Sequence, residues 1–600
     1  MAQASAISTP AWIHDLTFVA AIALPEASAD EFGTTINGMW ADPGGWTTER
    51  VAAAHARGRR ILVSVPLIAL THDVYERDEL AYLKDEICRD IHGGLAEVEW
   101  YYWDAKPVFA LCIHSPVVRA YLVDRLRGAI EAGVDVVNVD EINTSVGLMT
   151  RQPKGSGYCG RCLRDSTTIR DATRARDVSG PADDEVRAWL RDDLHLNRAF
   201  EVEQQARAFR NAERLLGELR ALAREHAKPV SITANVAGLG AFVGNHGPLW
   251  SAMWGELLDV IMLEAIYVVS QSQFEDPHAH KLLPRGTFAP LYRLGRALGP
   301  HAPIWIAPQI NVPRQLAGQR RQRYYELMFL EAYANRGRWG YNWWPGVDDA
   351  TRREATAPDA IKTWTAFMRA HRDLYVGLET ANDIAVVYSN AAVLAEPTAH
   401  YRYLALAQAL YEAGVQFDVI YTGDEQFAAA PLDVAQLAQY RLLIVPDGDR
   451  LSPSQAAALD VHAKGGGAVM RIASGSSTGK LLDRFWAEYR LEDRASIIAA
   501  VGINDGARIH VSVGRVVATR YVGPTGATLV HLLNCDYRAD RDEVEPGRDV
   551  VLRLPWDEDL PTATFLSPTD ERNLDARLDG EMLEVKVPVL IDHAVVEIVG

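Results

Sequence analysis

The sequence predicts an α/β protein that begins with a (β/α)8 barrel and continues into an open α/β domain and a small C-terminal β-sandwich. Eight short apolar segments, mostly separated by helix-like stretches, fill the first 345 residues. Strand and helix patterns keep alternating to about residue 499, and only strand patterns follow. We therefore predict three domains, with boundaries at 1–377, 378–499 and 500–600.

The eight segments have strand chemistry and the right number to close a barrel. They are LTFVAAIAL (16–24), ILVSVPLI (61–68), PVFALCIH (107–114), VDVVNVDE (134–141), PVSITANV (229–236), DVIMLE (259–264), PIWIAPQIN (303–311) and WGYNWWP (339–345). A (β/α)8 barrel places its chemistry at the C-terminal ends of its strands. The residues that end these segments are therefore the first candidates for a functional site.

The stretches between the segments support helices. In 117–133 apolar residues recur three and four positions apart, and a glycine then stops the pattern. The fourth connection, 142–228, is much longer than an ordinary βα loop and contains YCGRCLRD and a charged helical stretch near 185–226. We expect this insertion to shape the substrate pocket or an oligomer contact.

Two further patterns define the rest of the chain. NDIAVVYSN (382–390), YRYLALAQALYEAG (401–414), FDVIYTGD (417–424) and RLLIVPDGD (441–449) alternate strand and helix, as in an open α/β domain. After about residue 500 the segments RIHVSVGRVVATRYV, TLVHLLNCDY and LEVKVPVLIDHAVVEI alternate with period two. They predict the terminal β-sandwich.

Composition narrows the class of partner. The net charge of −18 over 600 residues argues against nucleic acid, because phosphate binding needs clustered Lys and Arg. No run approaches the roughly 20 apolar residues that span a bilayer, and the N-terminus lacks a targeting pattern, so we expect a cytoplasmic protein without a membrane partner. Five cysteines are too few for a disulfide framework in so long a chain.

Carboxylates end the fourth and sixth segments: Asp140 with Glu141, and Glu264. Glycoside cleavage needs two carboxyl groups, roughly 5 Å apart for retention and about 6.5 to 9.5 Å apart for inversion. Asp140 shares its strand face with the polar Asn138, which suits a barrel lumen. We therefore assign Asp140 as nucleophile and Glu264, in an apolar strand that would raise its pKa, as acid/base, with Glu141 as the alternative to Asp140. The alternative for each acid is helix capping or pairing with an arginine.

Polar and aromatic residues at other strand ends and loops could bind a sugar. Sugars present apolar C–H faces and rings of hydroxyls, so aromatic platforms and amide or imidazole partners suit them. The candidates are His114, Asn235, Gln309, Asn311, Trp343, Trp344, Trp40 and Trp103. For each aromatic residue, ordinary core packing is the competing interpretation.

Cys159 and Cys162 form a single CxxC pair. A structural zinc site needs four ligands, and no second CxxC or HxxxH follows, although His195 or a distant cysteine could complete one. We expect a packed cysteine pair, no metal and no cofactor.

The order of barrel, open α/β domain and β-sandwich resembles the family 42 β-galactosidases and a broader glycosyl hydrolase-like group. LIVPDGDRLSPSQAAALDVHAKGGGAVM (443–470) is similar to the trimerisation domain of those enzymes, which has a class I amidotransferase-like fold. LVHLLNCDY and the VPVLIDHAVVEI ending also resemble that group. The resemblance implies an assembly role for the middle domain, and hence a homo-oligomer, dimer or trimer.

The barrel departs from the family 42 pattern. Those enzymes carry Asn-Glu after the fourth strand and a nucleophilic Glu after the seventh, whereas here the fourth ends in Asp140-Glu141 and the seventh in PQIN without an acid. An acid pair after strands four and six looks more like the α-galactosidase clan. An Asp at strand four followed by a CxxC-bearing loop is similar to fucosidase-like proteins.

We expect a retaining, exo-acting glycoside hydrolase that acts on a small glycoside or oligosaccharide. One alternative is a glycoside phosphorylase on the same fold, in which inorganic phosphate replaces the nucleophile and a cation such as Arg314 holds it. The other alternative is a non-catalytic sugar-binding or assembly protein.

Overall fold

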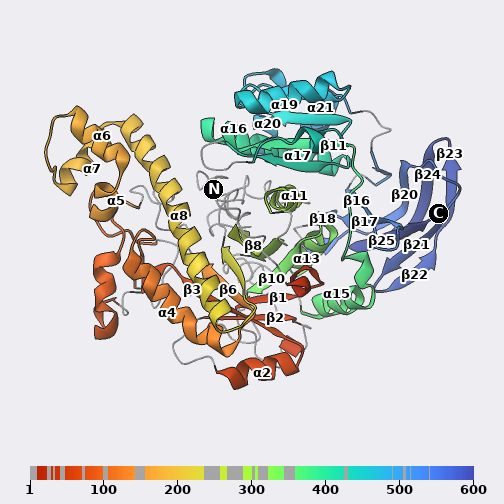
Figure 1. The fold of residues 1–600 in the computed structure, drawn as a ribbon. Helices are drawn as coiled ribbons and strands as arrows, with labels where there is room; N and C mark the ends of the chain where they lie inside the picture. The colour runs from red at the N-terminus through yellow and green to blue at the C-terminus, as the bar shows by residue number, and fades with distance from the viewer. Residues whose placement is uncertain are drawn as a thin grey trace. The chain divides into compact units, whose positions relative to one another are not determined.

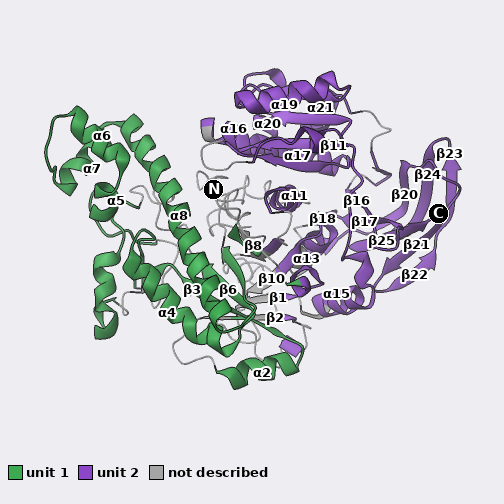
Figure 2. Cartoon of the chain, in the orientation of Figure 1, with its two compact units in different colours: residues 1–10, 37–263 green, residues 11–36, 264–600 purple. Residues whose placement is uncertain are grey.

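The computed structural model forms two compact units, residues 1–10 with 37–263 and residues 11–36 with 264–600 (Figure 2). The structure describes residues 10–22, 29–30, 34–40, 47–70, 74–98, 106–140, 142, 156–235, 257–265, 288–299, 304–308, 322–342, 358–396, 398–424, 430–488, 491–503, 508–513, 515–538 and 541–600.

A sheet of eight strands carries the first half of the chain, in the strand order of a closed barrel. That order is β1 (Val19–Ile22), β10 (Arg338–Asn342), β9 (Ile304–Pro308), β8 (Val260–Ala265), β7 (Ser231–Asn235), β6 (Val136–Asp140), β3 (Arg60–Pro66) and β2 (Ile36–Trp40). In the first unit β3, β6, β7 and β8 pair in parallel, and in the second unit β1, β10 and β9 do so. The predicted parallel barrel-type sheet is therefore present.

One predicted barrel strand is wrong. The segment 107–114 forms β5 (Val108–Ala110), which pairs antiparallel with β4 (Ile68–Leu70) in a separate two-stranded sheet. The barrel order instead gains β2, on the other side of β3 from β6. The sequence does not reveal this strand, because its INGMW contains the weak strand formers Asn37 and Gly38. Strong β-propensity predicts a strand but does not choose the sheet that the strand joins.

The helices of the first unit follow local capping chemistry. In α4 (Pro116–Ala132), Ser115 Oγ accepts hydrogen bonds from the Val117 and Val118 amides, and Gly133 ends the helix with φ of 92°. The other helices in the described part of this unit are α2 (Thr48–Ala56), η2 (Asp78–Glu86), α5 (Gly160–Arg164), α6 (Thr167–Ala175), α7 (Asp183–Asp192) and α8 (Leu194–Glu225). The charged stretch of the long insertion is thus helical, and α8 runs beside α4 (Figure 1).

The second unit contains a second parallel sheet. Its order is β12 (Asp418–Thr422), β11 (Ile384–Ser389), β13 (Leu442–Pro446) and β14 (Ala468–Ile472). Along the chain one or two helices separate each of these strands from the next. This confirms the alternation of strands and helices that the sequence predicts for this region. The described helices of this unit are η1 (Ala11–His14), α11 (Ala289–Leu298), α13 (Gln322–Ala334), α15 (Pro358–Ala370), η4 (Arg372–Leu374), α16 (Asn390–Ala395), α17 (Thr398–Glu412), α18 (Val434–Leu437), α19 (Pro453–Lys464), α20 (Ser477–Glu488) and α21 (Leu491–Ala500).

Antiparallel sheets complete the chain (Figure 1). One has the order β15 (His510–Val511), β20 (Gly547–Pro555), β24 (Met582–Leu590) and β23 (Ala576–Asp579). The other has the order β16 (Val516–Val522), β17 (Thr528–Asn534), β25 (His593–Val599), β21 (Thr562–Ser567) and β22 (Asp570–Asn573), and β18 (Tyr537–Arg538) pairs with β19 (Glu543–Val544). Alternate residues of both larger sheets, among them Leu532, Val596 and Val585, share one buried core, so the two sheets form a sandwich.

Among the described residues, no helix combines the length and the apolar character that crossing a bilayer requires.

Candidate functional site

Asp140 stands at the carboxyl end of β6, above a row of buried polar residues. Ser64, Asn138 and Thr233 are register partners across β3, β6 and β7, and all three are buried. Asn138 Nδ2 donates to Ser64 Oγ over 3.1 Å, and Thr233 Oγ1 donates to the Val260 carbonyl over 2.9 Å. Because strand side chains alternate, Asp140 lies on the same face as Asn138, and it is only half-buried. This polar face ends at a carboxylate, as a barrel-mouth site requires.

Acids at the opposite strand ends have a different role. Asp135, just before β6, accepts hydrogen bonds from the Ile61 amide at 2.9 Å, Arg60 Nη1 at 2.9 Å and His55 Nε2 at 2.8 Å. Asp259, just before β8, accepts from the Ile232 amide at 2.7 Å and Arg220 Nη2 at 3.3 Å. These two buried carboxylates join neighbouring strands through hydrogen bonds. Each also pairs with an arginine, which is one of the structural roles given above as the alternative to catalysis for strand-end acids.

Only some of the predicted site residues lie within the described part of the chain. The backbones of Glu264, Asn235 and Trp40 belong to β8, β7 and β2, and Asn235 is the register partner of Met262. Glu141, Gln309, Asn311, Trp343, Trp344 and Trp103 lie outside the described residues, as does Arg314. Catalysis by Asp140 with Glu264 or Glu141, and sugar binding by the polar and aromatic set, therefore stay predictions.

His114 does not end a barrel strand, which corrects its predicted position, because β5 lies outside that sheet. Its Nδ1 accepts from Asn211 Nδ2 of α8 over 2.9 Å, so the neutral ring carries its proton on Nε2. Burial lowers the pKa of His114 to about 4, which keeps the ring neutral at pH 7. Among the described residues Nε2 has no hydrogen-bond partner, so His114 offers a buried donor next to the insertion.

Four cysteines from three separate segments meet beside β5. The Sγ atom of Cys112 lies 3.7 Å from that of Cys159 and 3.7 Å from that of Cys162, and the latter two are 3.3 Å apart. Cys88 is buried, and its thiol forms a hydrogen bond with that of Cys112. The sequence showed only the CxxC pair, and the structure packs Cys112 against it, with Cys88 beside Cys112.

The Sγ atoms of Cys112, Cys159 and Cys162 lie close enough together to hold a thiophilic cation. Cys88, which hydrogen-bonds Cys112, is the candidate for a fourth ligand. Zn–S bonds of about 2.3 Å in a tetrahedron put the sulfurs about 3.8 Å apart, close to the separations around Cys112. Hydrogen bonds from neighbouring thiols hold the pKa of Cys112 well below its usual range, while bonding to Cys112 and burial raise the pKa of Cys88 and Cys162. Four thiolates cannot ionise together in this core without a cation, and a zinc ion would remove their repulsion.

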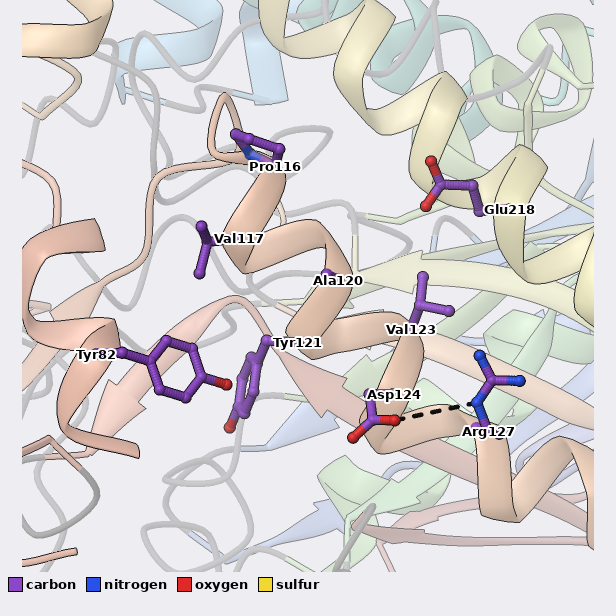
Figure 3. Close-up of a pocket in the computed structure, with 9 residues that line it drawn as sticks. All are labelled: Tyr82, Pro116, Val117, Ala120, Tyr121, Val123, Asp124, Arg127 and Glu218. Carbon is purple, nitrogen blue, oxygen red and sulfur yellow. Dashed lines mark ion pairs between the residues drawn. The ribbon is translucent and has the colours of Figure 1, made fainter. Parts of the chain in front are cut away.

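A surface groove lies on the outer face of α4 (Figure 3). It has a volume of about 770 Å³, and the Tyr82 and Tyr121 side chains line one end of it (Figure 3). At the other end Arg127 Nε pairs with Asp124 at 4.0 Å, near Glu218 of α8. The groove belongs to an outer helix of the barrel, so it is separate from the strand ends that carry Asp140.

Solved structures match almost the whole chain. These include an α-L-fucosidase isoenzyme 2 from Paenibacillus thiaminolyticus (TM-score 0.62, 12% identity, 98% of each chain covered). They also include β-galactosidases from Bacillus circulans sp. alkalophilus (TM-score 0.59, 11% identity) and from Halorubrum lacusprofundi (TM-score 0.58, 12% identity), each covering 98% of this chain and 99% of the other. No protein-family model and no curated protein matches the sequence.

These likenesses establish the fold. The protein has the architecture of glycoside hydrolases of the GH42 β-galactosidase kind. The order of the domains and the sequence segments of the middle domain predicted this. At identities of 11 to 13% they carry no residue roles to this chain.

Proposed function

We propose that the protein is a glycoside hydrolase that cleaves a small glycoside or oligosaccharide from its end. The observation that carries this is Asp140 at the carboxyl end of the fourth barrel strand, above the Ser64–Asn138–Thr233 row, in a fold that glycosidases use. In the proposed mechanism Asp140 attacks the anomeric carbon and Glu264 protonates the leaving oxygen, then activates water, which retains the configuration. Glu141 replaces Asp140 in the alternative assignment.

The proposed substrate is a neutral carbohydrate, and the enzyme is a cytoplasmic homo-oligomer that needs no cofactor for the chemical step. The strong net negative charge, −18, disfavours anionic polymers as substrates. Since the solved structures of this fold include a fucosidase and β-galactosidases, α-L-fucosides and β-D-galactosides are the first substrates to test.

The test is hydrolysis of a panel of nitrophenyl glycosides, both anomers, by wild type, Asp140→Asn, Glu141→Gln and Glu264→Gln. We expect one substrate to be cleaved by wild type and turnover to be lost in Asp140→Asn and Glu264→Gln, with azide restoring only the nucleophile variant. Cleavage only with added inorganic phosphate would favour the phosphorylase. If wild type binds a sugar without cleaving it, and Asp140→Asn abolishes that binding, the result would favour the non-catalytic sugar-binding protein.

We also propose that Cys88, Cys112, Cys159 and Cys162 hold a structural zinc ion. The sulfur separations among Cys112, Cys159 and Cys162 support this, and the buried Cys88 beside Cys112 is the proposed fourth ligand. Such an ion would fix the start of α5 against β5 and the chain after η2. Its role would be to anchor the long insertion, not to take part in glycoside cleavage.

A further inference from the structure

A second pocket lies in the second unit, between the helices α13 and α15 and the sandwich strands β21, β24 and β25. It has a volume of about 280 Å³, at the lower limit of small-molecule sites. Its wall is largely apolar, with the exposed Val589 and Ile591 at its margin. Trp364 and Phe565 supply two aromatic rings.

The floor of this pocket is a buried charged network. Arg323 donates to Glu326 Oε2 over 2.5 Å and to Asp592 Oδ1 over 2.7 Å, and Trp364 Nε1 donates to Glu326 Oε1 over 2.9 Å. Glu326 is only 3% exposed. One guanidinium thus faces two carboxylates.

The remaining charges do not offset this excess. Asp570, which also lines the pocket, is paired with the exposed Arg572. Asp542 accepts from the Arg323 backbone amide over 3.1 Å and adds a further carboxylate behind the network. The described part of the pocket therefore has an excess of negative charge.

His593 adds an acceptor rather than a donor. The Leu374 carbonyl can only accept, so His531 Nε2, 3.0 Å away, carries the proton of that neutral ring. His531 Nδ1 then accepts a hydrogen bond from the protonated Nε2 of His593 over 3.3 Å. The remaining His593 Nδ1 is a lone-pair acceptor in a residue that is 2% exposed, and it has no partner among the described residues.

We infer that this pocket binds a small organic cation, a primary ammonium or guanidinium group on a short apolar chain. The excess carboxylate charge favours a cation, the acceptors require a donor, and the aromatic rings suit an alkyl chain and a positive charge. Burial raises the pKa of both Glu326 and Asp592, and a bound cation would relieve the cost of ionising them. This inference is independent of glycoside cleavage.

The test is calorimetric titration of the full-length protein with n-butylammonium, at constant ionic strength, against the isosteric 1-butanol and the anion butyrate. We expect only the cation to bind, and Asp592→Asn to weaken its affinity at least about tenfold, as loss of one charge-assisted contact predicts. Asp579→Asn, an exposed carboxylate of the same sandwich paired with Arg553, is the matched control and should bind like wild type.

Further arms keep the test decisive. Ile591→Arg, at a residue that is 46% exposed, should fold and should also weaken binding, because it brings a competing guanidinium to the margin. If Nα-acetyl-lysine amide binds more tightly than n-butylammonium, the natural ligand is a lysine side chain of a protein. If n-butylammonium binds more tightly, the natural ligand is a free amine. The inference is overturned if 1-butanol binds as well as the cation, if no cation binds, or if both pocket variants bind like wild type.

Discussion

The sulfur atoms of Cys112 and Cys162 lie 3.7 Å apart although 50 positions separate the two residues. One belongs to the segment after β5 and the other to α5 at the start of the long insertion. Cys112 also contacts Cys159 and Cys88, so it is the member of the cluster that touches every other thiol. It is the residue whose replacement should affect a bound metal most.

Cys112→Ser should lower the zinc content of the purified chain from about one ion towards zero and lower its thermal midpoint, because three thiolates bind zinc less well than four. Elemental analysis with a thermal scan measures both. Cys535→Ser, a buried cysteine of the sandwich region, is the control and should keep its zinc. Equal zinc content in both variants, or none in wild type purified with zinc present, would contradict the metal site.

Asp140→Asn should reduce kcat by at least about 10²-fold while leaving the thermal midpoint nearly unchanged, because the half-buried carboxylate is assigned to chemistry rather than to packing. Steady-state kinetics on the substrate found with the glycoside panel measures this. Unchanged kcat in Asp140→Asn with loss of turnover in Glu141→Gln would move the reacting acid by one position.

Asp135→Asn, at the other end of the same strand, should show the opposite behaviour. Its carboxylate accepts from the Ile61 amide, Arg60 and His55, so the variant should lose about 1–3 kcal/mol of stability. Catalysis by the remaining folded protein should be unaffected. A chemical denaturation series together with kinetics at low temperature separates the two effects, and loss of kcat without loss of stability would refute the structural role.

Acid should destabilise the sandwich through His531 and His593. Burial lowers the pKa of His531 to about 4, and burial with the neighbouring His531 lowers that of His593 well below its usual value. The unfolded chain protonates both rings near pH 6.5 while the folded chain does not, so unfolding takes up protons. Stability should fall as pH drops from about 6.5 towards 4, by up to about 1.4 kcal/mol per pH unit for each ring.

The histidine contribution can be isolated with a variant. His593→Phe should flatten the dependence of the thermal midpoint on pH over this range, because one of the two rings no longer takes up a proton. The exposed His195→Gln should keep the wild-type slope. Identical slopes in wild type and His593→Phe would show that the buried rings do not control acid stability.

Gly414→Ala should destabilise more than Gly58→Ala. Both glycines have a left-handed backbone, with φ of 72° and 71°. A Cβ at Gly414 would lie 2.1 Å from the Ile509 carbonyl oxygen, whereas one at Gly58 would meet nothing within 4 Å. Gly58→Ala should therefore cost about 1–2 kcal/mol, the cost of the conformation alone, and Gly414→Ala more. Equal losses in denaturation experiments would contradict the steric argument.

The sequence by itself predicts those elements whose structure depends on interactions between residues close in the chain. The period of 117–133, the N-cap Ser115 and the stop at Gly133 fix α4, because each acts within a few residues. Alternating apolar residues likewise predict the terminal strands, since burial of one face selects period two. The acids Asp140 and Glu264 stand out in the sequence because they end apolar segments, and their catalytic roles stay predictions.

Only the tertiary structure decided which distant segments meet. It put β2 in the barrel order and β5 outside it, because strand pairing depends on long-range register and not on the propensity of one segment. It also joined Cys88 and Cys112 to the CxxC pair and placed the Ser64–Asn138–Thr233 row below Asp140. Side-chain chemistry is thus determined locally, whereas a site is determined by the fold that brings its members within a few ångströms.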